Sequence, residues 1–336
     1  MIALAVLLRR LLVALATLAG VAVVVFVLLR VVPGDPVAMM ISPGASAADV
    51  AALRAHYGLD GSLLSQFLVW LRYALRGDFG VSISLHRDVL DLLGERLPAT
   101  LELAAAALEF AVIVGGAVAI LGAMARRTWL ESVIDAVNGL LLAIPDFVWA
   151  LALVLAFGVV WPLLPLTGRV DPSVGAGMVT PFYLAETLLK LRLDVFFDLL
   201  KHLAMPTLAL GLPLATVIAR VLKGALNEAM AQDYVLLARL KGMSEFRLVL
   251  QEALRNAIGP TLALTGVQFT FLIGGTVIIE RIFAYPGIGN MAIEAVINRD
   301  LPLIQGLVLV FAVIFIGINI AVDLLVALFN PKLRYA

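Results

Sequence analysis

The sequence contains no cysteine among its 336 residues, and only 14% of its residues are charged. The absence of cysteine excludes disulfides, thiolate metal sites and cysteine nucleophiles. Soluble domains carry roughly 25% charged residues, so this scarcity of charge indicates a membrane protein. Basic and acidic residues number 24 each, and the resulting zero net charge gives no reason to expect a nucleic-acid partner.

Several motifs with known chemistry are also missing. No glycine is followed by lysine, so the chain has no Gly-x-x-x-x-Gly-Lys loop for binding nucleotide phosphates. The His-Glu-x-x-His and Gly-x-Ser-x-Gly patterns are absent too, which disfavours an intramembrane enzyme. The three histidines, His56, His86 and His202, are isolated and lack metal-ligand spacing. We therefore expect no catalytic residue, metal or cofactor in this chain.

Long apolar runs dominate what is present, because 62% of the residues are hydrophobic. About 20 apolar residues cross the hydrocarbon core as a helix. Six runs are candidates: Leu11–Leu29, Leu101–Met124, Ala136–Val160, Leu203–Val221, Thr261–Ile279 and Leu303–Phe329. The first is too long for a typical signal-peptide core, so we interpret it as an uncleaved anchor. The predicted fold class is an all-α integral membrane protein with six transmembrane helices.

Basic residues near the ends of the runs predict the orientation, because cytoplasmic loops are enriched in Lys and Arg. If the six runs alternate in direction, most flanking basic residues fall on one side: Arg9, Arg10, Arg126, Arg127, Arg220, Lys223, Arg239, Lys241, Arg247, Arg255, Lys332 and Arg334. We therefore expect both termini in the cytoplasm. Arg30 lies at the outer end of the first run, where a long side chain can snorkel to the interface.

These runs predict one bundle with two outer inserts. Residues 1–32 would form the first transmembrane helix, and residues 33–99 an extracytoplasmic insert. Residues 100–336 would form a five-helix core with a second insert (161–202) and a cytoplasmic loop (222–259). In the first insert, leucines and Phe67 at helical spacing predict an amphipathic helix that ends at Gly77, with Gln66 on another face.

The cytoplasmic loop contains the pattern of two short helices joined by a glycine. Asp233 can cap a helix over Tyr234–Lys241, whose last turn holds Arg239, a favourable place for a cation. Gly242 fits the left-handed residue that ends many helices, and Ser244 can cap the next helix. Periodicity alone leaves a plain connection equally open. The length of the loop and its apolar leucines favour a docking surface.

The stretch DYVLLARLKGMSEFRLVLQEALRNAIGP (233–260) resembles the cytoplasmic loop of bacterial ATP-binding-cassette importer permeases, especially the first permease subunit of dipeptide and oligopeptide importers. The matching positions are Ala238, Arg239, Lys241, Gly242, Ser244, Ala253, Leu254, Arg255, Asn256 and Pro260. Further motifs of that group occur in the same order: VVPGDP (31–36), LPATLELA (97–104), LPLTGRV (164–170), ERIFAYPGIG (280–289) and NPKLRYA (330–336). The Glu-Ala-Ala opening of the broader loop motif reads Leu236-Leu237-Ala238 here, and peptide permeases commonly lack that glutamate.

The resemblance implies a type I importer permease fold, multi-pass in a bacterial cytoplasmic (inner) membrane, and a chain that is not itself an enzyme. In such permeases the two short helices joined by a glycine form the coupling helix, which sits in a groove of a separate ATPase subunit that binds ATP and Mg²⁺. The residues assigned to this coupling loop are Asp233, Tyr234, Ala238, Arg239, Lys241, Gly242, Ser244, Arg255 and Asn256.

Partners and cargo follow from the same resemblance. A second homologous permease, two ATPase subunits and an extracytoplasmic solute-binding protein are expected. Peptides are the leading cargo. Nickel chelates, glutathione, opines and oligosaccharides are carried by the same group and remain alternatives.

Polar side chains inside the apolar runs are costly, so they usually face the interior of a bundle. The candidates for contact with a translocation path are Glu109, Asn138, Asp146 and Gln268. Each could instead tie helices together, and for Asp146, which follows Pro145, helix packing is favoured. A secondary transporter is a further alternative, but the chain shows none of the matching broken halves typical of that class.

Overall fold

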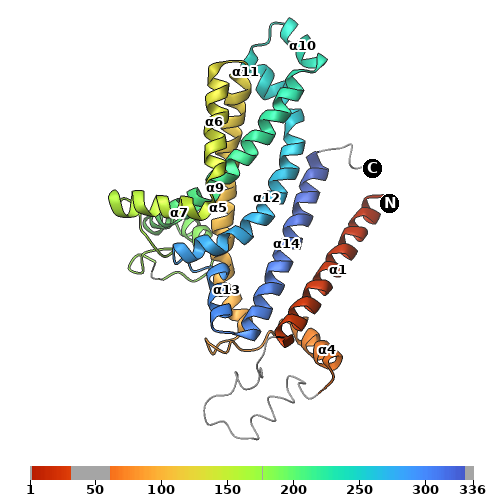
Figure 1. Ribbon diagram of the computed structural model, residues 1–336, viewed down its shortest axis with the longest axis vertical. Helices are drawn as coiled ribbons and strands as arrows, with labels where there is room; N and C mark the ends of the chain where they lie inside the picture. Colours follow the sequence, from red (N-terminus) through yellow and green to blue (C-terminus); the bar gives the residue numbers. More distant parts are fainter. Residues whose placement is uncertain (1, 32–60, 176, 330–336) are drawn as a thin grey trace. The chain divides into compact units, whose positions relative to one another are not determined.

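The computed structural model describes residues 2–31, 61–175 and 177–329, and these residues are overwhelmingly helical. The predicted all-α class is therefore confirmed (Figure 1). The chain divides into two compact units, which we describe separately. Unit 1 comprises Met1–Leu97 and Met291–Gly317, and unit 2 comprises Pro98–Asn290 and Ile318–Ala336. The motif at 330–336, and all but Val31 of the motif at 31–36, lie outside the described residues.

Unit 1 contains α1 (Ile2–Val31), α4 (Leu63–Ala74), the start of α5, the end of α13 and the first part of α14. The amphipathic helix predicted in the first insert is α4, and it packs on α1 through aromatic rings. Phe67 meets Phe26 edge-on, with 5.3 Å between ring centroids. Gln66 is buried rather than turned away, because its amide donates to the carbonyl of Gly61 at 2.9 Å.

Unit 2 contains most of the remaining helices: the rest of α5 (Val89–Met124), α6 (Trp129–Ala143), α7 (Asp146–Leu153), η1 (Val154–Val160), α8 (Tyr183–Leu189), α9 (Leu193–Met230), α10 (Asp233–Leu240), α11 (Glu245–Arg247), η2 (Leu248–Ala253), α12 (Leu254–Ile282), the start of α13 (Ile288–Ile297) and the end of α14 (Leu301–Phe329). The central helix is α9, which packs against α6, α7 and α12.

Glycines allow α5 and α9 to approach closely. A Cβ added to Gly115 of α5 would lie 2.5 Å from the carbonyl oxygen of Ala215 on α9. A Cβ on Gly211 would lie 2.6 Å from the ring of Phe110 on α5. Small residues at such crossings are typical of helices packed within membranes, where close backbone contact supplies the attraction. The close packing of α5 against α9 fixes the positions of the loops that connect the helices of unit 2.

Four helical segments of the described chain are long and apolar enough to cross a membrane: Val89–Met124, Leu193–Met230, Glu245–Ile282 and Leu301–Val322. A fifth is present if the bent pair Trp129–Ala143 and Asp146–Val160 counts as one span. The first predicted span, Leu11–Leu29, lies within α1 (Ile2–Val31). The described residues therefore establish a multi-pass membrane protein with up to five such spans.

The third predicted span, Ala136–Val160, is not one continuous helix. α6 ends at Ala143, Ile144 is extended with ψ 120°, and α7 begins after Pro145, with a bend of 93° between the two pieces. Proline disfavours a helical conformation in the residue before it and cannot donate to the preceding turn. Here that effect breaks the helix, so the predicted span consists of two helices.

Candidate functional site

The elbow, which we define as residues 232–256, begins with α10. Gln232 precedes the helix in an extended conformation and is its N-cap, although its side chain makes no capping hydrogen bond. Asp233 was predicted as the cap, but it is the first helical residue instead. A carboxylate in the first turn still interacts favourably with the positive end of the helix dipole.

Gly242 ends α10 with the predicted left-handed conformation, at φ 84°. Its N–H donates to the carbonyl of Arg239 at 3.0 Å, and the N–H of Met243 donates to the carbonyl of Ala238 at 3.3 Å. These two bonds form a Schellman motif, which satisfies the last carbonyls of a helix. Ser244 then caps α11 through its extended backbone, without a side-chain bond.

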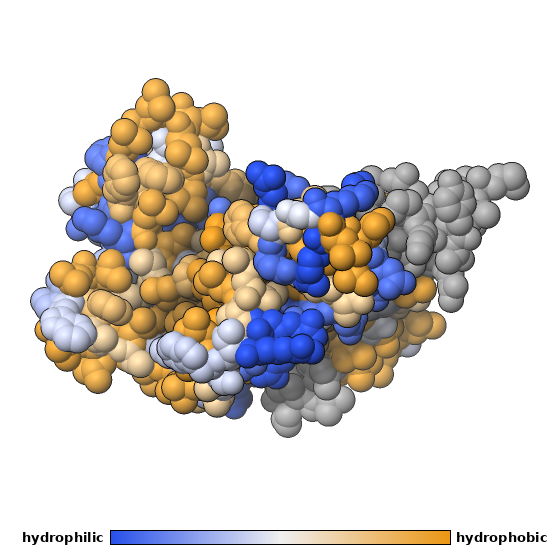
Figure 2. Space-filling model, turned by 90° about the horizontal axis from the view of Figure 1, so that it is seen from above, coloured by the Kyte–Doolittle hydropathy of each residue, from blue (hydrophilic) through white to orange (hydrophobic). Residues whose placement is uncertain are grey.

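The outer surface of the elbow is apolar and exposed. Its large side chains are Tyr234, Leu236, Leu237, Leu240 and Phe246. Leu240 is 77% exposed, whereas Val235 on the inner face is fully buried. Arg239, Lys241, Arg247 and Arg255 are exposed around these side chains. Figure 2 looks onto the end of the molecule that carries α10, where hydrophobic and hydrophilic residues lie side by side.

Two polar contacts hold the elbow in shape. The guanidinium of Arg239 binds the carboxylate of Glu245 at 2.7 and 3.0 Å, which closes the turn between α10 and α11. That hydrogen-bonded carboxylate raises the pKa of Arg239 above its already high ordinary value. The amide of Asn256 donates to the Tyr234 hydroxyl at 2.8 Å, so α10 is tied to the start of α12. Four predicted residues of the coupling loop thus lie in one folded element: Tyr234, Arg239, Gly242 and Asn256.

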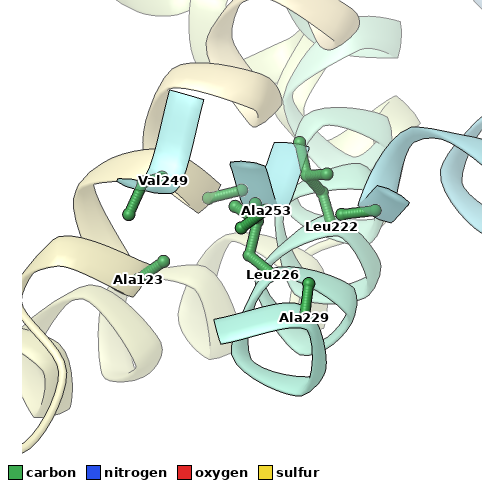
Figure 3. Packing of buried hydrophobic residues seen from close by; sticks show 8 residues of the cluster. Ala123, Leu222, Leu226, Ala229, Val249 and Ala253 are labelled. Carbon is green, nitrogen blue, oxygen red and sulfur yellow. The ribbon is translucent and has the colours of Figure 1, made fainter. Parts of the chain in front are cut away.

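A buried cluster joins the elbow to the bundle. Val249 and Ala253 of η2 pack with Ala123 of α5 and with Leu222 and Leu226 of α9 (Figure 3). Most members of this cluster are alanine, valine or leucine, so the helices meet at short range. The helical path from α11 through η2 to α12 is unbroken. A displacement of the elbow would therefore move α12 and the cluster with it.

The four candidates for the translocation path occupy different places. Glu109 is exposed on α5, and Gln268 is half-buried on α12. Asp146 is half-buried at the start of α7 and faces α12, since a Cβ on Gly275 would lie 3.4 Å from its carboxylate. Asn138 of α6 lines a cavity of about 330 Å³ that none of the other three reaches. The structure does not assemble these residues into one site.

The cavity that contains Asn138 lies between α6 and α9, and sequence reasoning did not find it. Its lining is Glu131, Asp135, Asn138, Arg220, Lys223, Gly224 and Asn227. Lys223 is almost fully buried and binds Asp135 at 2.7 Å and Glu131 at 2.9 Å. The basic residues of α9 entered the sequence analysis only as markers of orientation. Acidic residues four apart, at 131 and 135, were the available signal, because they share a helix face.

Three motifs that are distant in the sequence meet at the other end of unit 2. Thr100, from LPATLELA, donates to the fully buried carboxylate of Glu280, from ERIFAYPGIG, at 2.7 Å. The backbone N–H of Asn290 donates to the same carboxylate at 2.9 Å. A Cβ on Gly287 would overlap this carboxylate, so the glycines of the motif admit the buried side chain.

The third motif, LPLTGRV, joins this cluster through Arg169. Its guanidinium binds Glu102 at 2.5 Å, donates to the carbonyl of Pro181 and lies 4.0 Å from the centre of the Tyr183 ring. The N–H of Gly168 donates to the carbonyl of Phe283 at 2.9 Å. The sequence order of these motifs gave no sign that they converge. They hold α5, α8 and α12 together at the end of unit 2 remote from the elbow.

Comparison with known proteins identifies the family. The profile described as "Binding-protein-dependent transport system inner membrane component" matches residues 111–335. A companion profile, "Binding-prot-dependent transport system membrane comp, N-term", matches residues 3–104. The chain belongs to this family. The resemblance to importer permeases that the sequence motifs indicated is confirmed, and the elbow is an element of a membrane permease.

Curated relatives match the permease along almost its whole length. It is 34% identical to the probable peptide ABC transporter permease protein y4tP of Sinorhizobium fredii, over 98% of each chain. It is 36% identical to the di/tripeptide transport system permease protein DppB of Pseudomonas aeruginosa, over 97% of this chain and 98% of the relative. It is 35% identical to the glutathione transport system permease protein GsiC of Escherichia coli, with the same coverage.

A solved structure supports the fold of the permease. The structure of inward-facing conformations of the MetNI methionine ABC transporter (CY5 native crystal form) aligns with a TM-score of 0.54. The alignment covers 71% of this chain and 96% of that chain, at 17% identity. Identity this low carries the fold alone.

Proposed function

We propose that the permease translocates short peptides across the bacterial cytoplasmic membrane as the transmembrane subunit of an ATP-driven importer. The observation that carries this proposal is the full-length similarity to permeases named for peptides, at 34% and 36% identity. The exposed elbow agrees with it, because a permease without a nucleotide-binding loop needs a surface on which a separate ATPase can act.

The elbow supplies the coupling in this proposal. Its exposed leucines would enter a groove of the ATPase subunit, where ATP and Mg²⁺ are bound, while the surrounding arginines would meet acidic or polar groups at the rim. The firm contact of η2 with α5 and α9 would carry the movement of the ATPase into the bundle. The chain itself would perform no hydrolysis.

The complete assembly in this proposal has four kinds of subunit. This permease would pair with a second, homologous permease, so that the path for the cargo lies between them. Two ATPase subunits would bind on the cytoplasmic side, and a solute-binding protein would deliver cargo from outside. Six spans with both termini in the cytoplasm would place the elbow on the ATPase side.

Uptake by proteoliposomes tests the proposed function. The complete complex, with its binding protein and ATP, is expected to accumulate a radiolabelled dipeptide, whereas a complex without this permease accumulates none. Peptide accumulation that does not require the permease would contradict the proposal, and so would a complete complex that imports a nickel chelate or an oligosaccharide but no dipeptide.

Glutathione is the second candidate cargo. The permease is 35% identical to the glutathione permease GsiC, almost the same value as for the di/tripeptide permease. Glutathione is a tripeptide with a γ-linked first residue, so the chemistry of the two cargoes overlaps. The same uptake assay tests this alternative by competition. Unlabelled glutathione should inhibit the uptake of labelled dipeptide if the importer accepts both cargoes, and should leave it unchanged if the importer does not accept glutathione.

A further inference from the structure

The cavity between α6 and α9 carries polar groups that have no partner in the described chain. The guanidinium of Arg220 makes no ion pair or hydrogen bond with any described residue, and neither does the amide of Asn138. The buried carboxamide oxygen of Asn227, in the same wall, also lacks a hydrogen-bond partner there. Arg220 is exposed and Asn138 is half-buried, so both are free to bind a ligand, whereas the buried oxygen of Asn227 is a group that folded proteins seldom leave without a donor.

The cavity lining has equal numbers of positive and negative side chains, but they do not all pair with one another. Lys223 is occupied by Glu131 and Asp135, with contacts of 2.9 and 2.7 Å. Arg220 is the second cation, so the lining contains two cations and two carboxylates and has no net charge. An anionic lipid headgroup would be attracted by Arg220 but repelled by the carboxylates. A zwitterion would instead find a partner for each of its charges.

We propose that this cavity is a cargo subsite, in which Arg220 binds the terminal carboxylate of a peptide and the amide of Asn138 hydrogen-bonds its backbone. Arginine suits this role because its planar fork binds a carboxylate through two hydrogen bonds. The volume of about 330 Å³ is at the lower end of the range for small-ligand sites, which suits a short peptide or the end of a longer one. The proposal rests on the proposed function, and it adds a residue that distinguishes free from blocked peptide termini.

Lys223 has a positioning role in this subsite. By binding both Glu131 and Asp135, it offsets one of their two negative charges. It thereby leaves Arg220 as the cation available to the cargo. Gly224 lies at the exposed edge of the cavity, and a Cβ there would meet no atom within 4 Å. A larger side chain at Gly224 can therefore enter the cavity without strain in the helix.

The test compares a dipeptide with its C-terminal amide in proteoliposomes that contain the complete importer and its binding protein. In the Arg220→Gln variant, we expect the ratio of free-acid to amide uptake to fall about tenfold, the effect of losing one charge-assisted contact. Because both complexes use the same binding protein, its own preference cancels when the two ratios are compared.

Matched variants control for nonspecific effects. Arg126→Gln removes the same charge from the exposed turn before α6, outside the cavity, and should leave the ratio unchanged. Gly224→Leu should reduce the uptake of both peptides, whereas Gly259→Leu, at a helical glycine with no atom near its Cβ, should not. An unchanged ratio in Arg220→Gln, or an equal fall in Arg126→Gln, would overturn the subsite while leaving peptide transport intact. A wild-type complex that imports no peptide would overturn both proposals.

Discussion

The ammonium group of Lys223 on α9 lies 2.7 Å from the carboxylate of Asp135 on α6. This contact, with a second one to Glu131, joins two helices close to the elbow, because Lys223 lies only seven residues before the end of α9 at Met230. The Lys223 side chain is 11% exposed and that of Asp135 is 56% exposed. The pair is therefore neither fully buried nor a free surface ion pair.

Removing the cation alone should destabilise this contact. Lys223→Met is expected to lower the stability of the purified complex by less than the about 3–5 kcal/mol typical of breaking a buried pair, because Asp135 remains partly hydrated. Adding Glu131→Gln and Asp135→Asn should restore most of the loss, since no unpaired carboxylate remains. Thermal unfolding measures both effects. A triple variant no more stable than Lys223→Met would contradict this account.

The exposed leucine of the elbow provides a test of docking. Leu240→Asp should leave the permease folded, because this side chain is 77% exposed, yet it should weaken co-purification with the ATPase subunit at least tenfold. Val235→Asp is the contrasting variant, since it places a charge at a fully buried position and should reduce the yield of folded permease. Normal binding of the ATPase by Leu240→Asp would show that the exposed leucines of the elbow are not the docking surface.

The left-handed turn of the elbow should not tolerate a β-branched residue. Gly242→Val adds about 1–2 kcal/mol of backbone strain at φ 84°, although its Cβ would meet open space. We expect normal abundance in the membrane, reduced uptake and weaker stimulation of the ATPase. Gly242→Asn should be milder, because asparagine adopts this conformation more readily. Wild-type transport by Gly242→Val would show that the turn only connects two helices.

The buried hydrogen bond between Thr100 and Glu280 should contribute to stability. Thr100→Val keeps the shape of the side chain but removes the donor to Glu280 and the acceptor for the N–H of Ile288. The expected loss is about 1–3 kcal/mol for each buried group left without a partner, observed as a lower unfolding temperature. Thr265→Val is the control, because Thr265 only bonds back to the carbonyl of Thr261 within its own helix. Equal effects of the two variants would count against the Glu280 contact.

The second insert should resist acid through Glu186. Hydrogen bonds from Lys190, then from the Thr180 hydroxyl and the backbone N–H groups of Val179 and Thr180, lower the pKa of Glu186 from 4.5 to about 2. A carboxyl with a lowered pKa stabilises the fold fully above its unfolded pKa, and this contribution is lost as the pH falls from about 4.5 towards about 2.

Hydrogen exchange at Val179 and Thr180 can follow this dependence. After correction for intrinsic rates, amide protection should be constant from pH 7 to about 5 and should decline below that. Glu186→Gln should lose this protection at every pH, while Asp194→Asn, an exposed carboxylate on the same insert, should behave like the wild type. Protection that is independent of pH in the wild type would contradict the role of Glu186.

Local features of the elbow could be predicted from the sequence, because they depend on neighbouring residues. A glycine after the last turn of a helix predicts a left-handed end, and Gly242 has this conformation. The cap was misplaced by one residue, since Asp233 and Gln232 are both compatible with a helix start. Apolar length likewise located α5, α9, α12 and α14, because hydrocarbon thickness fixes the length of a span.

What the sequence by itself determined is the class of protein, the elbow and the family motifs. Only the tertiary structure decided which distant residues meet: Thr100 with Glu280, Arg169 with Glu102, and Lys223 with Asp135. Pairs separated by 67 to 180 residues along the chain leave no periodic signal, because their distance depends on how whole helices cross. The break at Pro145 and the cavity beside Arg220 arise in the same way, from helix packing that no local pattern encodes.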